Sequence, residues 1–415
     1  MFSNRPRVLI YSHDSFGLGH LRRCRAIAHS LVSRFSELSV LILSGSPIIG
    51  SFDFKSRVDF VRVPGVIKLR NGEYTPLSLH IDIEHTLAIR ASIIEHTARV
   101  FDPDIFLVDK EPLGLRGEVE STLLSLKETG TRLILGLRDV MDDSDMLADE
   151  WERKDVYPAL DDLYDDIWVY GLPTIHDPFA GLPVSQRIRD KTRFTGYLER
   201  KAPKEGHPVD PFPFEDGDYI LVTPGGGGDG VELVEWVMRA YESHGDRLPQ
   251  AVVVLGPFMN AENQNDFIAR AEEIEKIHMI RFTPHIEDLM RHARAIVGMG
   301  GYNIFCEMLS FDKPTLLVPR VVPRREQAIR AAKAEANGLV QVLPIHHYPD
   351  IGMMVAALEN LLEAPPPSAA GHTGLLNGLD VIGGMVGEIL EGRTGSYDEE
   401  ETADGRIATE AVGVS

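Results

Sequence analysis

Residues 296–327 read IVGMGGYNIFCEMLSFDKPTLLVPRVVPRREQ. The stretch starts as a short apolar strand, breaks at glycines and continues as a helix, and a second strand then leads into a charged run. Glycines let a ligand approach the backbone, and the unpaired N–H groups at a helix start favour an anion such as phosphate. Both strand ends are expected at one edge of an open α/β sheet, where ligands bind. The candidate binding residues at this edge are Gly300, Gly301, Asn303, Glu307, Arg320, Glu326 and Gln327.

Length and charge limit what this site can belong to. A chain of 415 residues is too long for one ordinary core, so two α/β domains are expected. Hydrophobic residues make up 43% and charged residues 25%, as in soluble globular proteins. The formal net charge of -21 disfavours nucleic acid as a partner. A basic run nevertheless keeps peripheral membrane contact among the expectations. It consists of Arg320, Arg324, Arg325 and Arg330.

Cysteine content and apolar runs indicate the compartment. Cys24 and Cys306 fall on apolar helix positions in separate halves and are predicted to be reduced core thiols. The N-terminal apolar run, residues 8–11, is too short for a signal sequence. No run approaches the roughly 20 apolar residues of a membrane span. We therefore expect a cytoplasmic protein.

The alternation of strand and helix patterns divides the chain. We expect an N-terminal Rossmann-like domain over residues 1–199 and a Pro-rich linker over residues 200–217, where periodicity is lost. A second parallel α/β domain is expected over residues 218–375, followed by a helix over residues 376–391. Residues 392–415 are rich in acidic residues and are predicted to be a disordered tail.

The first strand, residues 7–12, leads into the turn HDSFGLGH and a helix. Its Gly-x-Gly lacks the third glycine of the dinucleotide fingerprint, so it is weak evidence for NAD. Two imidazoles and a carboxylate at a strand end favour a functional turn, although a tight connection with a polar cap is the alternative. The candidate residues here are His13, Asp14, Gly17, Gly19 and His20. Asp109 ends a later strand and is either functional or merely a solvated strand end.

The second half begins with a strand followed by TPGGGGDG, residues 223–230. Four successive glycines before a helix form a backbone cradle for an anion. A phosphate-binding NTPase loop would need Gly-Lys-Ser/Thr, and there is no lysine in this loop. A structural glycine turn is the alternative. The cradle residues are Gly225, Gly226, Gly227 and Gly228.

These runs resemble the GT-B glycosyltransferases, and the second half resembles the branch that contains the peptidoglycan N-acetylglucosaminyltransferase. The similar runs are FGLGH (16–20), TGYL (195–198), TPGGGGDG (223–230) and GGYNIFCEM (300–308). The run YSHD-x-FGLGHLRR is more similar still to a group of predicted glycosyltransferases without an assigned substrate. Where Gly300 and Glu326 stand, the better-known branch has serine and glutamine, which leaves the transferred sugar open.

The resemblance implies two Rossmann-like domains facing each other across a cleft, with the acceptor on the first and the donor on the second. It implies that the glycine loop faces the donor diphosphate, that Glu307 holds the ribose hydroxyls, and that Glu326-Gln327 contact the donor sugar. From the chemistry alone, helix N-termini neutralise the leaving phosphate without a metal, and a base from the first domain deprotonates the acceptor. The candidate bases are His20 or Asp109, with His13 and Asp14 next, and Arg320 and Arg324 are candidates to meet the diphosphate. Asp102-Pro103-Asp104 precedes a strand, so we interpret it as a turn rather than a metal motif.

The sequence therefore predicts an inverting, metal-independent glycosyltransferase that moves a sugar from a nucleoside diphosphate sugar, taken to be UDP-linked, to an unidentified acceptor. No cofactor beyond the donor substrate is expected. Two alternatives remain open. One is a nucleotide-sugar epimerase or hydrolase of the same fold, and the other is a non-catalytic nucleotide-sugar-binding protein.

Overall fold

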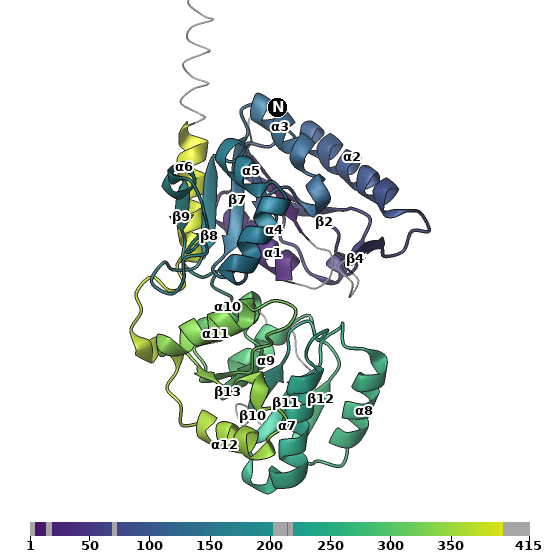
Figure 1. The fold of residues 1–415 in the computed structure, drawn as a ribbon, viewed down its shortest axis with the longest axis vertical. Helices are drawn as coiled ribbons and strands as arrows, with labels where there is room; N and C mark the ends of the chain where they lie inside the picture. Colours follow the sequence, from purple (N-terminus) through teal and green to yellow (C-terminus); the bar gives the residue numbers. More distant parts are fainter. Residues whose placement is uncertain (1–4, 14–18, 69–72, 202–213, 215–218, 393–415) are drawn as a thin grey trace, which may run out of the picture.

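The structure, a computed structural model, describes residues 5–13, 19–68, 73–201, 214 and 219–392. Two domains are stacked along the long axis, and the chain returns from the second to the first at its C-terminal end (Figure 1). The expected division into two Rossmann-like parallel-sheet domains is confirmed.

Within the described residues, the first domain holds a parallel sheet of seven strands in the order β3-β2-β1-β6-β7-β8-β9. Its strands are β1 (Arg7–Ser12), β2 (Ser39–Ser44), β3 (Val58–Arg62), β6 (Ile105–Asp109), β7 (Arg132–Arg138), β8 (Asp166–Tyr170) and β9 (Thr192–Phe194), beside an antiparallel pair, β4 (Val66–Lys68) and β5 (Tyr74–Pro76). Its helices are α1 (Gly19–Arg34), α2 (Ile83–Phe101), α3 (Glu120–Glu128), α4 (Ser144–Arg153), α5 (Val156–Asp162) and α6 (Gln186–Asp190), with short η1 (Ile49–Ser51) and η2 (Leu115–Gly117).

The central strands of this sheet are apolar on both faces because helices cover both. In β1, Val8 and Ile10 pack into one core together with α1, while Leu9 and Tyr11 pack into another with α2 and α3. Such burial on both sides is typical of parallel sheets built from βαβ units. The helix α2 is capped at its start by Asp82, whose side chain accepts from the backbone N–H of His85.

Within the described residues, the second domain holds six parallel strands in the order β12-β11-β10-β13-β14-β15. They are β10 (Tyr219–Thr223), β11 (Gln250–Val254), β12 (Ile277–Ile280), β13 (Ala295–Gly298), β14 (Thr315–Leu317) and β15 (Gln341–Val342). The helices are α7 (Val231–His244), α8 (Ala261–Ala271), α9 (Ile286–His292), α10 (Tyr302–Phe311), α11 (Glu326–Ala336) and α12 (Ile351–Leu361), with short η3 (Gly245–Arg247), η4 (Ile345–His347) and η5 (Pro367–Ala370).

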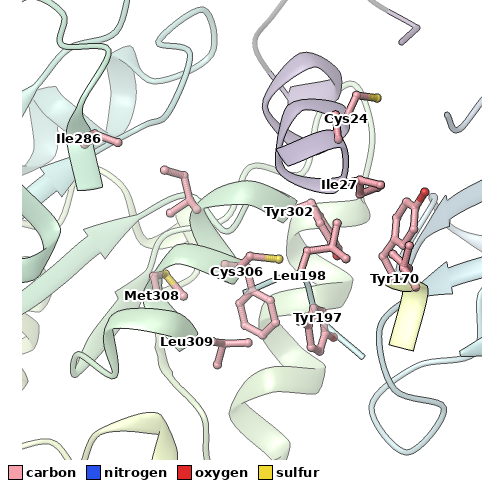
Figure 2. Packing of buried hydrophobic residues seen from close by; sticks show 14 of the residues in the cluster. Cys24, Ile27, Tyr170, Tyr197, Leu198, Ile286, Tyr302, Cys306, Met308 and Leu309 are labelled. Carbon is pink, nitrogen blue, oxygen red and sulfur yellow. The ribbon is translucent and has the colours of Figure 1, made fainter. Parts of the chain in front are cut away.

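The two domains share a hydrophobic contact. Tyr302 and Cys306 of α10 lie beside Tyr197 at the end of the first domain and near Cys24 of α1 (Figure 2). The Tyr197 and Phe305 rings meet edge to face with centroids 5.1 Å apart. Cys24 and Cys306 are both buried and form no disulfide, as predicted.

Residues 378–392 form a helix that lies against β8 and β9 of the first domain (Figure 1). Its start is joined to the end of that domain, where the N–H of Tyr197 donates to the carbonyl of Leu375 and the N–H of Gly378 donates to the carbonyl of Tyr197. The helix begins two residues after the predicted position. Most of the predicted linker and almost all of the predicted tail lie outside the described residues.

Candidate active site

Both sheets reverse their strand order at one point, and the candidate residues follow those points. In the first domain the reversal falls between β1 and β6. His13 follows β1, and Asp109 is the last residue of β6. In the second it falls between β10 and β13, which precede the two glycine turns. Open α/β sheets bind ligands at such switch points. A cavity of about 290 Å³ lies between the domains and is lined by His20, Arg138 and residues 224–229, 301–304, 320 and 327.

His20, on the first turn of α1, lies against the carboxylate of Asp109. Its Nδ1 is 2.5 Å from Asp109 Oδ2. Arg23 holds the same carboxylate from one turn further along, donating from Nε to Oδ1 at 2.8 Å and from Nη2 to Oδ2 at 2.5 Å. The two residues that the sequence offered as alternative bases therefore form one unit.

The protonation of this unit follows from its partners. Arg23 Nη2 lies 3.1 Å from the same Nδ1, but its shorter contact is the one to Asp109 Oδ2. A carboxylate can only accept, so His20 donates its Nδ1–H to Asp109 and keeps a lone pair on Nε2. Burial lowers the pKa of His20 to about 4, although Asp109 opposes the shift. Burial acts to raise the pKa of Asp109, but Arg23 and His20 outweigh it and the pKa lies below its usual value. At neutral pH the unit is a neutral imidazole oriented by an ionised carboxylate, as general base catalysis requires.

The glycine loop after β10 turns tightly before α7 begins at Val231. Gly225 and Gly227 have φ of +81° and +88°, a region that favours glycine. A side chain at Gly227 would also meet the carbonyl oxygen of Leu255. All four loop glycines line the cavity at the start of a helix of 14 residues. The loop can therefore offer N–H groups to an anion.

The second glycine turn leads into α10, and Asn303 on its first turn bridges the domains. Its Nδ2 donates to the carbonyl of Gly19 at 2.9 Å, and its Oδ1 accepts from Arg200 Nη2 at 3.0 Å. Gly19 was expected on the acceptor side, and here it contacts the donor wall. The α1 helix that carries His20 is thereby fixed to the start of α10.

Glu307 lies behind this wall and is fully buried. Arg22 lines the cavity and covers it, with Nη2 2.6 Å from Glu307 Oε1 and 2.7 Å from Glu287 Oε1. Burial raises the pKa of Glu307 to about 7. The carboxylate assigned to ribose by resemblance is thus held by a first-domain arginine, and a ribose would have to share or replace it.

The end of the quoted stretch contributes Gln327 and Arg320 to the cavity, whereas Glu326 lies beneath them. Arg320 donates from Nη2 to Glu326 at 3.0 Å, and Gln327 Oε1 accepts from the Arg320 backbone N–H at 3.2 Å. Arg138, at the end of β7, adds a cation from the first domain, 3.9 Å from Glu326. Among the described residues, the Arg138 Nε has no hydrogen-bond partner.

His13 belongs to a second, larger cavity of about 780 Å³ in the first domain. Its ring meets that of His20 edge to face, with centroids 5.6 Å apart. The two histidines are therefore in contact while each lines a different cavity. Asp14 and Gly17 lie outside the described residues.

The structure corrects two expectations about arginines. Arg324 does not face the glycine turns but lines the first-domain cavity, 3.0 Å from Glu150. Within the basic run, Arg330 is not at the surface but fully buried against Asp139, whereas Arg325 is exposed. Arg330 Nη1 also donates to the carbonyl of Gly300 at 2.9 Å. Arg324 and Arg330 therefore hold the domains together, and peripheral membrane contact of the run stays a prediction.

Sequence reasoning missed Arg22 and Arg23 as site residues. Both belong to the run HLRR, which was quoted only for its resemblance. The available signal was a pair of arginines on the helix that follows the turn, where a buried arginine requires a carboxylate partner.

The run Asp102-Pro103-Asp104 was predicted to be a turn rather than a metal motif. Asp102 ends α2 with a left-handed backbone conformation. The described residues contain no group of His, Cys, Asp or Glu placed to hold a metal ion.

Two Rossmann-like domains with a shared cavity and a returning C-terminal helix define the GT-B glycosyltransferase fold. Residues 219–362 match the glycosyltransferase family 28 C-terminal domain. The chain also matches a Caenorhabditis elegans protein described as a UDP-glucuronosyltransferase, ugt-60, with 33% identity over 78 residues. That match covers 18% of this chain and only 15% of the length of the relative.

Solved structures share the architecture over nearly the whole chain. The glycotransferase of kitacinnamycin superposes with a TM-score of 0.63 at 15% identity, covering 93% of this chain and 100% of its own. MurG of Acinetobacter baumannii superposes with a TM-score of 0.55 at 11% identity, covering 91% of this chain and 98% of its own. A UDP-N-acetylglucosamine 2-epimerase superposes with a TM-score of 0.60 at 12% identity, covering 93% of this chain and 95% of its own. At these identities the likeness concerns the fold. No helix in the described part of the chain has the length and apolar character of a membrane span.

Proposed function

We propose that the protein is an inverting glycosyltransferase that uses a nucleoside diphosphate sugar. The observation that carries the proposal is that His20, with its Nε2 lone pair, lines the same cavity as both glycine turns of the second domain. The diphosphate lies against the starts of α7 and α10, with Arg138 as an added cation, and no metal or cofactor is assigned. Gln327 faces the sugar, and Arg22, held from behind by the buried Glu307, faces the ribose.

In the reaction, His20 Nε2 takes the proton of an acceptor hydroxyl while its oxygen bonds to the anomeric carbon. The bond from that carbon to the diphosphate oxygen breaks, and the diphosphate leaves with the electron pair. A single displacement inverts the anomeric carbon. Asp109 keeps the imidazole in the required tautomer and stabilises the imidazolium as it forms. A UDP-linked donor is favoured because one relative is described as a UDP-glucuronosyltransferase and one protein of similar structure is a UDP-N-acetylglucosamine 2-epimerase.

Titration calorimetry with a panel of UDP-, dTDP- and GDP-sugars tests the proposal, with Gly227→Ala as a variant that blocks the loop. We expect one nucleotide family to bind to the wild type and to bind Gly227→Ala at least tenfold more weakly. A protein that binds none of the panel would contradict the proposal.

The epimerase likeness supports a second candidate function, which requires no acceptor. Rapid conversion of the bound donor to an altered or free sugar, with no acceptor added, would favour an epimerase or hydrolase over a transferase. Donor binding with no turnover under any condition, unaltered by His20→Ala, would favour a nucleotide-sugar-binding protein.

A further inference from the structure

A buried chain of hydrogen bonds runs from α2 to His13 and has no part in the reaction described above. Arg90 donates to both oxygens of Glu118, at 2.6 and 2.5 Å. The Tyr11 hydroxyl donates to Glu118 Oε1 at 2.5 Å, and His13 Nδ1 lies 3.3 Å from that hydroxyl oxygen. None of these four side chains belongs to an exposed surface.

The direction of each bond is determined by chemistry. A guanidinium only donates and a carboxylate only accepts, so the hydrogen of Tyr11 goes to Glu118. Burial together with the Glu118 charge keeps the pKa of Tyr11 well above 10, and the phenol retains its proton. His13 must then donate its Nδ1–H to Tyr11. Burial lowers the pKa of His13 to about 3, so the ring is neutral and Nε2 carries a lone pair.

His13 and His20 are therefore built alike. Each is a neutral imidazole whose Nδ1–H is held by a buried network that ends in an arginine and a carboxylate. These are Arg23 and Asp109 for His20. For His13 they are Arg90 and Glu118, reached through Tyr11. Among the described residues, the hydrogen bonds of both rings are at Nδ1. Two lone pairs are thus available on neighbouring rings whose centroids are 5.6 Å apart, with His20 lining the interdomain cavity and His13 lining the second cavity.

We propose that the acceptor carries two neighbouring hydroxyls and that His13 accepts a hydrogen bond from the second one while His20 deprotonates the first. The proposal rests on the proposed function and names the chemical class of its acceptor, a diol. Two hydroxyls on adjacent carbons can each donate to one imidazole across this spacing. An acceptor with one hydroxyl leaves the His13 lone pair without a donor, at the cost of a buried unmade hydrogen bond. His13 takes no proton and is a specificity residue.

Imidazole ¹⁵N NMR of the full-length protein, bound to its donor, tests the geometry with two matched probe pairs. These are catechol with phenol, and trans-cyclohexane-1,2-diol with cyclohexanol. Near neutral pH, His13 is expected with Nδ1 protonated and Nε2 bare. The diols are expected to shift Nε2 of both histidines, and the monohydroxyl probes to leave His13 unchanged. An Nε2–H tautomer at His13, or diols that fail to shift it at saturating concentration, overturns the proposal.

Donor turnover gives an independent readout. The ratio of kcat/KM for catechol to that for phenol is expected to be about tenfold or more, the worth of one hydrogen bond. Tyr11→Phe, which leaves the His13 ring in place but frees its tautomer, is expected to reduce the ratio several-fold. His13→Leu should lower this ratio to about one, so that the preference for catechol is lost. His13→Gln retains an acceptor oxygen and should restore part of the preference. An unchanged ratio in His13→Leu contradicts the proposal.

Donor binding distinguishes a failure of the diol proposal from a failure of the proposed glycosyltransferase function. A protein that binds and turns over a nucleotide sugar without preferring diols contradicts the acceptor class alone. A protein that binds no nucleotide sugar contradicts the function itself.

Discussion

Replacing Asp109 with asparagine keeps the shape of the side chain but reverses one of its hydrogen bonds. Arg23 donates to both carboxylate oxygens, at 2.8 and 2.5 Å, so the amide can satisfy only one of them. If its oxygen accepts from Arg23 Nε, its NH₂ faces His20 Nδ1 and forces the hydrogen of the imidazole onto Nε2. The lone pair that takes the acceptor proton is then lost.

A positioned general base contributes about 10²–10⁴-fold to rate, or about 3–5 kcal/mol of barrier at 1.36 kcal/mol per tenfold. We therefore expect Asp109→Asn to reduce nucleoside diphosphate release by about 10³-fold, with donor affinity within threefold of wild type. Breaking a buried ion pair is also expected to cost about 3–5 kcal/mol of stability. Release is measured by a coupled assay on protein whose folding has been checked by circular dichroism.

Asp166→Asn is the matched control for this experiment. Asp166 accepts from Arg132 Nε at 2.7 Å, but it starts β8, at the opposite edge of the sheet from the site. Its replacement removes an arginine–aspartate pair of the same sheet, whose arginine is 42% exposed, and should leave diphosphate release unchanged. If folded Asp109→Asn retains more than a tenth of wild-type activity, the assignment of His20 and Asp109 as one catalytic unit is wrong.

The remaining predictions concern pH and the contact between domains. Because the pKa of His20 is lowered to about 4, kcat/KM should stay constant through pH 6.5 and fall only near pH 4, whereas a midpoint near 6.5 would contradict the buried neutral imidazole. Glu307 has a pKa raised to about 7 from 4.5, so the folded state binds more protons than the unfolded state between these values. The contribution of Glu307 to the free energy of unfolding should accordingly fall as pH rises from 4.5 to 7, whereas the lowered pKa values of His13 and His20 act in the opposite direction. Glu307→Gln should therefore make the free energy of unfolding rise more steeply with pH in urea titrations, and an unchanged pH profile would contradict the raised pKa of Glu307. Arg330→Met leaves Asp139 buried without its counter-ion and should cost about 3–5 kcal/mol, measured as a lower denaturation midpoint, while a loss below 1 kcal/mol would show that the pair does not hold the domains.

The sequence predicted the fold well because its signals are local. A strand, a glycine turn and a helix start recur at residues 7–20, 219–231 and 295–302, and each becomes a βα unit of a parallel sheet. The position of the glycine loop at the interdomain cavity was predictable for the same reason, since the loop and its helix are contiguous in the chain, while its binding of a donor stays a prediction.

Contacts between distant segments were not predictable in this way. His20 and Asp109 are 89 residues apart and meet because β1 and β6 are neighbours in the sheet, an order that no local pattern specifies. The burial of Glu307 depends on Arg22 reaching across from the other domain. Arg330 was expected at the surface because its partner, Asp139, lies in the other domain and could not be identified from the local sequence.

The most direct test of the account is a paired measurement of donor affinity and diphosphate release in wild type and His20→Ala. The nucleotide sugar found by the binding panel serves as the donor, with catechol as acceptor. We expect His20→Ala to bind this donor within about twofold of wild type but to release diphosphate about 10³-fold more slowly. Equal release rates in the two proteins would contradict the central claim that His20 is the base facing a donor held by the two glycine turns.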